Sequence, residues 1–185
     1  MGNYKWDVGS EKIILRGRGV NRKSFYLVDL ALGDTTIYLD SSVFNHEGAY
    51  VPVLKWNLSK DGSMMLIQSE RDRIWRHSNT GTYYILDIAQ RSLAKVSDKN
   101  DLLRNVKISP DNRWLSYIRE DNNLYAYNIK RKREKKLTRT GSETILNGHY
   151  GWVYEEELSG FDGYRWSPNS KYIAYVEEDQ SEVGR

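Results

Sequence analysis

Residues 108–118, ISPDNRWLSYI, combine a turn with an alternating strand. In the turn, proline presets φ, aspartate and asparagine bond to their own backbone, and asparagine tolerates a positive φ. In residues 114–118 successive side chains alternate between two faces, which is the period of two of a β-strand. The segment is therefore predicted to be the turn and second strand of a β-hairpin.

The same pattern recurs three more times. The copies are WDVGSEKIIL at 6–15, WNLSKDGSMMLI at 56–67 and WSPNSKYIAYV at 166–176. The four copies begin at positions 6, 56, 108 and 166, so they are 50, 52 and 58 residues apart. A repeat of this length indicates a repeated structural unit.

A second hairpin follows each of the first three copies. It joins residues 24–30 to 33–39, 82–88 to 91–96, and 123–129 to 133–137, each time as an apolar strand, an Asp or Asn, a polar turn and a short edge strand. Four strands in roughly 45 residues are typical of a β-propeller blade. A β-sandwich would also explain many short strands, but not the repeated placement of Trp or Ser-Pro-Asp.

The expected fold class is therefore all-β, with blades of four antiparallel strands at about 4–40, 54–98 and 105–139 and a half-blade at 163–178. Residues 40–53 are expected to link two blades, and 140–162 to form an insertion, which in repeat proteins is often on the binding face. Three and a half blades do not close a ring, because closed propellers have about 4–8. The chain is thus expected to be a partial propeller within a larger protein.

Composition narrows the function classes. The 185 residues include 28 basic and 25 acidic ones, a net charge of +3 that gives no support to nucleic-acid binding. The exception, KRKREKK at 130–136, is predicted to be a solvated turn, with an anionic or nucleic-acid surface as the alternative. There is no cysteine, and the three histidines lack metal-ligand spacing, so no metal or cofactor is predicted. No apolar run approaches the ~18 residues of a membrane span.

The chain also lacks the usual catalytic motifs. It has no G-x-S-x-G elbow, no P-loop, and only an incomplete glycine pattern at 17–19. No catalytic residue is predicted in this chain, and the 185 residues alone are expected to hydrolyse nothing.

One acidic stretch stands out within the insertion. Residues 151–158, GWVYEEEL, place three carboxylates directly behind two aromatic residues. Taken alone, such a run is most simply a solvated acidic turn of a short helix. The stretch IWRHS at 74–78 supplies a fixed cation that could face it.

These two stretches resemble a known family. NGHYGWVYEEEL at 147–158, followed by GYRWSPNS at 163–170, resembles the N-terminal propeller of the dipeptidyl peptidase IV family, and WRHS at 75–78 with YYILD at 83–87 is similar to a second motif of that propeller. In that family an eight-bladed propeller precedes an α/β-hydrolase domain that holds a Ser-Asp-His triad. The other blades and the hydrolase domain are missing here.

The resemblance implies roles for individual residues. Glu156 and Glu157 match the carboxylates that hold the substrate's α-ammonium, and Arg76 matches the arginine that contacts a substrate carbonyl and braces them. Glu155 is expected to be a solvated or structural neighbour. Trp152 and Tyr154 are expected to pack so as to fix the short helix. His77 is expected to be structural.

The main hypothesis is a substrate-gating, amine-anchoring propeller region of a serine exopeptidase that releases N-terminal dipeptides. The alternative is a non-catalytic interaction propeller of a pseudo-peptidase; a generic protein-binding propeller would not explain the paired motifs. The implied partners are a peptide with a free N-terminus, the missing hydrolase domain and a second copy in a homodimer. The compartment is left open; the family suggests a secreted, periplasmic or membrane-anchored protein.

Overall fold

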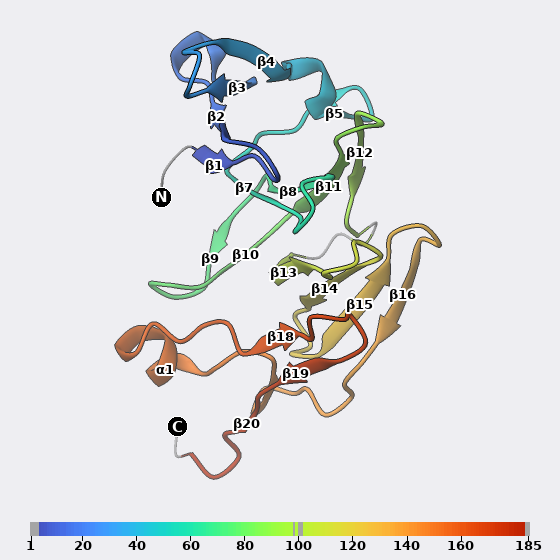
Figure 1. Cartoon of the computed structure of the whole chain (residues 1–185). Coiled ribbons are helices and arrows are strands. Elements are labelled where there is room, and N and C mark those ends of the chain that lie inside the picture. The colour runs from blue at the N-terminus through green and yellow to red at the C-terminus, as the bar shows by residue number, and fades with distance from the viewer. Residues whose placement is uncertain (1–3, 98, 100–101, 184–185) are drawn as a thin grey trace.

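A computed structural model describes residues 4–97, 99 and 102–183. Its regular structure is nearly all antiparallel strands, gathered in small sheets that follow one another along an arc (Figure 1). The first sheet has its four strands in chain order: β1 (Tyr4–Trp6), β2 (Lys12–Arg16), β3 (Phe25–Asp29) and β4 (Thr35–Leu39). A 3-10 helix at Gly19–Asn21 connects β2 to β3.

The second and third sheets repeat this meander. The second contains β7 (Lys55–Leu58), β8 (Met64–Gln68), β11 (Tyr83–Asp87) and β12 (Ser92–Lys95). The third contains β13 (Leu103–Ile108), β14 (Trp114–Ile118), β15 (Leu124–Asn128) and β16 (Arg133–Lys136). A hairpin of β9 (Asp72–Arg73) and β10 (Asn79–Gly81) leaves the second sheet between β8 and β11 and pairs with β13 of the third.

The fourth unit is assembled from two hairpin-like pairs. β18 (Tyr164–Trp166) pairs with β19 (Ile173–Tyr175), and β20 (Glu177–Asp179) pairs with β17 (Ile145–Asn147). The 140–162 insertion thus contributes a strand as well as the helix α1 (Trp152–Glu157). Among the described residues, no helix is long and apolar enough to cross a membrane.

Residues 40–53, expected to be a linker, are part of the core. They form a 3-10 helix (Ser41–Phe44) and a hairpin of β5 (Asn45–His46) and β6 (Ala49–Tyr50). Phe44 is fully buried, and its ring lies 5.4 Å from that of Phe25 in β3. The connection therefore also fills the space between the first two sheets.

The predicted turns have the same hydrogen bonds in three copies. A serine hydroxyl donates to the Asp or Asn two residues later, and it accepts from the N–H five residues later. These serines are Ser59 (2.8 and 3.0 Å), Ser109 (2.7 and 2.9 Å) and Ser167 (2.8 and 3.0 Å). The fourth turn position has a positive φ in each copy: Gly62 (74°), Asn112 (58°) and Ser170 (58°). The sequence repeat is therefore a repeat of local geometry.

Successive turns also bind one another. Asn112 Nδ2 donates to Asp61 Oδ1 at 2.6 Å, and the Asp111 N–H donates to Ser170 Oγ at 2.9 Å. The Ser63 N–H, together with the Ser59 and Asn112 side chains, lowers the pKa of Asp61. The turns thus connect neighbouring sheets at one edge.

The turns that follow the third strand of each sheet are also alike. Asp29, Asp87 and Asn128 each accept, through Oδ1, the N–H of the residue three positions later, at 3.1, 2.9 and 2.8 Å. The next residue in each has a positive φ. The basic stretch 130–136 begins in the last of these turns, and residues 130–133 are exposed. Residues 130–132 therefore agree with a solvated turn, whereas residues 133–136 form β16.

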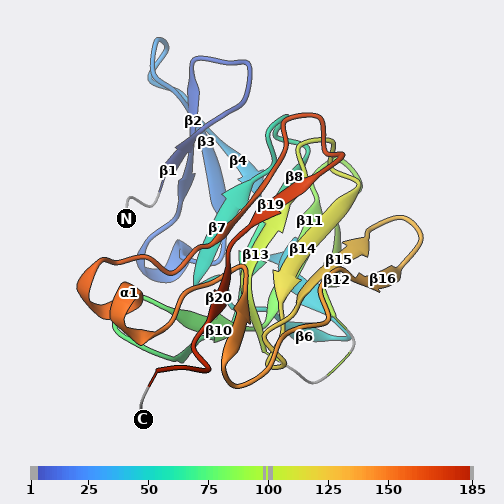
Figure 2. The same ribbon diagram turned by 90° about the horizontal axis from the view of Figure 1, so that it is seen from below.

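Burial in β14 does not alternate as a half-exposed strand would. Leu115 and Tyr117 pack against the second sheet, while Ile118 packs against Tyr164 of the fourth unit. Ser116, on the same face as Ile118, is also fully buried. Both faces are covered because each inner sheet lies between two others; the view from below shows β19 beside β13 and β14 (Figure 2).

Tyr164 forms the polar joint between the third sheet and the fourth unit. Its hydroxyl, fully buried, donates to the Asn105 carbonyl oxygen at 2.5 Å and accepts from Ser116 Oγ at 3.1 Å. Trp166 Nε1 donates to the same Ser116 oxygen at 2.8 Å. The joint is therefore made by hydrogen bonds inside an apolar contact.

Replacing Tyr164 by phenylalanine is expected to lower the free energy of unfolding by about 1–3 kcal/mol, because a buried carbonyl loses its donor. Urea denaturation measures the change. Tyr175, its exposed cross-strand partner in β19, is the matched control, and Tyr175→Phe is expected to have little effect. Equal effects of the two substitutions would contradict the assignment.

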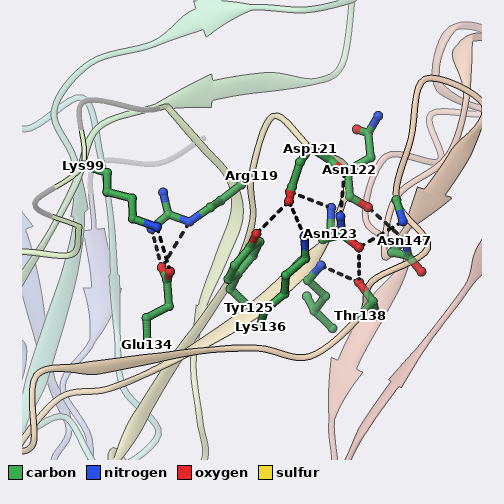
Figure 3. Close-up of polar contacts among 12 residues, drawn as sticks. Lys99, Arg119, Asp121, Asn122, Asn123, Tyr125, Glu134, Lys136, Thr138 and Asn147 are labelled. Atoms are coloured by element: carbon green, nitrogen blue, oxygen red, sulfur yellow. Dashed lines mark hydrogen bonds and ion pairs between the residues drawn. The ribbon is translucent and has the colours of Figure 1, made fainter.

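The third sheet also has a polar cluster at the side away from α1. Figure 3 shows Lys99 and Arg119 around Glu134, and beside them Asp121 with Tyr125 and Lys136. The Arg119 side chain is only 7% exposed. This cluster ties the β14–β15 turn to β16.

Candidate functional site

The helix α1 contains the acidic motif. It follows Gly151, whose extended backbone begins the helix and whose N–H donates to Glu178 Oε2 at 2.9 Å. It ends at Leu158, whose N–H reaches the Tyr154 carbonyl oxygen at 3.2 Å. The helix has six residues, and only one of them, Glu155, is buried. Apolar packing therefore contributes little to holding it in place.

The β9–β10 hairpin brings the second motif to this helix. Its tip, residues 74–78, is closed by a hydrogen bond from the Ile74 N–H to the Ser78 carbonyl oxygen at 3.2 Å. Both views place the tip next to α1 (Figures 1 and 2). Arg76 and Glu156 are 80 residues apart in the sequence and are hydrogen-bonded to each other. The fold therefore brings the two motifs into contact.

Arg76 binds Glu156 with two groups. Its backbone N–H donates to Oε1 at 2.5 Å, and its Nε lies 3.2 Å from Oε2. The Glu156 side chain is 14% exposed, whereas that of Arg76 is 66% exposed. The guanidinium group therefore braces the carboxylate and still presents N–H groups to solvent.

Glu155 has a different environment. Its side chain is completely buried and forms an ion pair with Arg104 of β13, while its other oxygen accepts the hydroxyl of Ser78. Burial lowers the pKa of Arg104 to about 10, so its guanidinium stays charged at neutral pH. Of the two expectations for Glu155, a solvated residue is wrong and a structural partner is what the geometry gives.

Glu157 is exposed at the end of the helix. Within the described part of the chain, no hydrogen bond or ion pair to its side chain is found. Two of the three carboxylates are therefore matched by arginines, and the third is not.

The aromatic residues beside the motif are more exposed than expected. Trp152 is 53% and Tyr154 47% exposed, although the Tyr154 ring lies 5.4 Å from that of Tyr150. Both side chains are thus only about half-buried within this chain, and their expected role in fixing the helix stays a prediction. His77 is also exposed; it lines a cavity of about 300 Å³ with residues of β7, β13 and the 161–162 loop, and its expected structural role stays a prediction.

Comparison with known proteins decides the family. Residues 59–185 match the family described as the dipeptidyl peptidase IV (DPP IV) N-terminal region. The chain belongs to this family. The matched range includes both motifs and three of the four turn repeats, so the resemblance seen in the sequence is confirmed.

The relatives of this DPP IV N-terminal region are much longer proteins. The chain is 32% identical to dipeptidyl aminopeptidase B of Saccharomyces cerevisiae and 30% identical to dipeptidyl peptidase 4 of Sus scrofa. These alignments cover 86% and 85% of the chain but only 19% and 20% of the relatives. The chain thus spans about a fifth of the length of the curated relatives it matches.

Solved structures confirm the fold class. The crystal structure of Porphyromonas gingivalis dipeptidyl peptidase 4 superimposes with a TM-score of 0.85 at 23% identity, over 99% of this chain and 26% of that one. TolB from Acinetobacter baumannii matches with a TM-score of 0.50 at 17% identity, over 97% of this chain and 38% of that one. The DPP IV N-terminal region described here is an all-β arrangement of propeller blades, whose sheets do not form a closed ring among the described residues.

Three residues of the site were not predicted from sequence. Arg104 lies in a stretch without any motif, so no local signal identifies it. Ser78 belongs to the arginine motif, but its contact with Glu155 depends on the fold. His149 belongs to the acidic motif, but no local signal identifies a role for it; in the DPP IV region it is buried, with Nε2 3.0 Å from Asn122 Oδ1.

The buried His149 makes stability depend on pH. Burial, with the nearby Arg104 charge as a second cause, lowers the pKa of His149 to about 3. Below pH 6.5 His149 is therefore protonated in the unfolded chain but stays neutral in the folded chain. The free energy of unfolding consequently falls as pH decreases. Between pH 6.5 and 5 the free energy of unfolding is expected to fall by about 1.5 kcal/mol.

The His149→Gln variant should largely remove this pH dependence, whereas His77→Gln, at an exposed histidine, should leave it unchanged. Denaturation at several pH values above 5 measures it, where most carboxylates stay ionised and contribute little. A wild-type slope in His149→Gln would contradict the assignment.

Proposed function

We propose that this chain is the substrate-gating, amine-anchoring part of a DPP IV-like serine exopeptidase that releases N-terminal dipeptides. In this proposal, the catalytic serine lies in a hydrolase domain elsewhere in a longer polypeptide. The present residues contribute binding and orientation to the reaction and no nucleophile.

The charge balance of the site carries the proposal. Glu155 is paired with Arg104, and Glu156 with Arg76, while the exposed Glu157 is not compensated by either arginine. One negative charge is left, next to a carboxylate that is already held in place. This is the complement of a single ammonium group.

The proposed binding mode follows from donor and acceptor counts. An ammonium group has three N–H donors, and a carboxylate has about four lone-pair sites, so Glu156 can accept from a ligand while it stays bound to Arg76. Each charge-assisted hydrogen bond of this kind contributes about 1.5–3 kcal/mol. The exposed guanidinium of Arg76 is left to donate to a carbonyl oxygen of the same peptide.

Such a site selects for the distance between the free amino terminus of the peptide and the bond that is cleaved. A peptide threaded past it would bring an amide where the ammonium should be, and would leave carboxylates desolvated without a cation. Cleavage would then be limited to a fixed distance from a free amino terminus, which is the meaning of gating here.

The test compares two peptides with proline as the second residue, one with a free amino terminus and one N-acetylated. The full-length protein is expected to release a dipeptide from the free peptide, with a kcat/KM at least tenfold higher than for the acetylated one. The isolated 185-residue chain, as a control, should cleave neither. Equal cleavage of both peptides would contradict the amine anchor.

A further inference from the structure

We propose that Arg104 and Ser78 are positioning residues: by holding the buried carboxylate of Glu155 they set the spacing between Arg76 and the two anchoring glutamates. The inference rests on the proposed function and adds residues to it. Neither residue is expected to touch the substrate.

The first observation is how α1 is attached. Its one buried side chain is a carboxylate, Glu155. The apolar members of the helix, Trp152 and Val153, are 53% and 57% exposed. The helix is therefore anchored by an ion pair where most helices use an apolar side chain.

The second observation is where the partners of Glu155 come from. Arg104 is in β13 at the start of the third sheet, and its side chain is only 9% exposed. Ser78 is in the hairpin tip, 1% exposed and two residues from Arg76. One carboxylate thus links the helix, the tip and the third sheet.

The third observation is the adjacency of this link to the anchor. Glu155 precedes Glu156 directly, and Ser78 follows Arg76 closely, so each half of the anchor is within two residues of the link. Arg76 contacts Glu156 at 2.5 and 3.2 Å, and these contacts require the hairpin tip and the helix to keep their relative position.

A buried ion pair is a costly way to gain stability, because desolvation of both charges offsets most of the attraction. Its advantage is directional: a guanidinium fork and a hydroxyl define the position of a carboxylate more narrowly than apolar packing does. This precision matters in a site that selects substrates by a distance, because a misplacement of about 1 Å can lower the rate by a factor of about 100.

The test uses the double variant Arg104→Met/Glu155→Gln in the full-length protein. It removes both charges, so neither is left buried alone, and it keeps an amide that Ser78 can bond. We expect the variant to fold with nearly the wild-type melting temperature. Its kcat/KM for a free-amine dipeptidyl substrate should fall about tenfold or more, mainly through KM. Labelling of the catalytic serine by a fluorophosphonate should be unchanged.

The matched control is a second ion pair of the same sheet, Arg119 with Glu134 (Figure 3). Its arginine is as buried as Arg104 but lies in the polar cluster away from α1. Arg119→Met/Glu134→Gln should therefore also fold with nearly the wild-type melting temperature, and its KM should not change.

The outcomes separate the two proposals. If the Arg104 double variant folds and keeps the wild-type KM, the positioning role is wrong. If it does not fold, Ser78→Ala decides: a several-fold rise in KM supports the role and an unchanged KM overturns it. If Glu157→Gln leaves dipeptide release intact, the amine anchor itself fails, whatever Arg104 does.

Discussion

In the full-length protein, Glu157→Gln is expected to lower kcat/KM for a free-amine dipeptidyl substrate by about 10- to 150-fold, the equivalent of one charge-assisted hydrogen bond of 1.5–3 kcal/mol. The physical reason is that, among the described residues, no arginine is paired with Glu157, whereas Glu155 and Glu156 each have one. Its exposed side chain has no hydrogen-bond or ion-pair partner in the part of the chain that the structure describes, so the melting temperature should not change.

Two comparisons sharpen this prediction. Glu11→Gln, at an exposed glutamate of the first sheet, should leave the kinetics unchanged. Glu156→Gln should lower kcat/KM further than Glu157→Gln, because it also weakens the contact that holds Arg76. Wild-type kinetics in Glu157→Gln would refute the anchor, and so would wild-type kinetics in Glu156→Gln.

Gly81→Ala is expected to have the second large effect, at the root of the hairpin that presents Arg76. A Cβ at Gly81 would lie 2.2 Å from the Glu70 carbonyl oxygen and 2.7 Å from Gln68 Nε2. A backbone atom cannot turn aside as a side chain can, so the two arms of the hairpin must separate. The free energy of unfolding should fall by about 1–3 kcal/mol, and Arg76 should move relative to Glu156.

Dipeptide release by Gly81→Ala should therefore fall by about tenfold or more. Thermal unfolding and steady-state kinetics on the same samples measure both effects. Gly160→Ala is the control beside the helix, since the nearest atom to its Cβ would be at 3.5 Å. If Gly81→Ala matches Gly160→Ala in both measurements, the close approach is not important.

Much of the fold could be predicted because its signals are local. The hydroxyl of Ser109 bonds to a side chain two residues away and to an N–H five residues away. A turn of this kind is specified within six residues, so repeats of it can be counted in the sequence. The turn made by the Asp or Asn at the end of each third strand is equally local.

Other parts could not be predicted, because they depend on which segments meet. The alternation in 114–118 indicates a strand but not that both faces are covered. The pairing of β17 with β20 joins residues of an insertion to strand residues 30 to 34 positions later. Neither segment has a pattern that identifies the other.

The acidic helix shows the same division. The sequence by itself determined that three consecutive carboxylates follow two aromatic residues, that an arginine motif precedes them, and to which family the pattern belongs. The tertiary structure alone decided that Glu155 is the buried member, that Arg76 reaches Glu156, and that Arg104 is involved at all. The reason is that desolvation of a carboxylate is set by the chain segments that cover it. Those segments come from β13 and a hairpin tip that are distant in sequence.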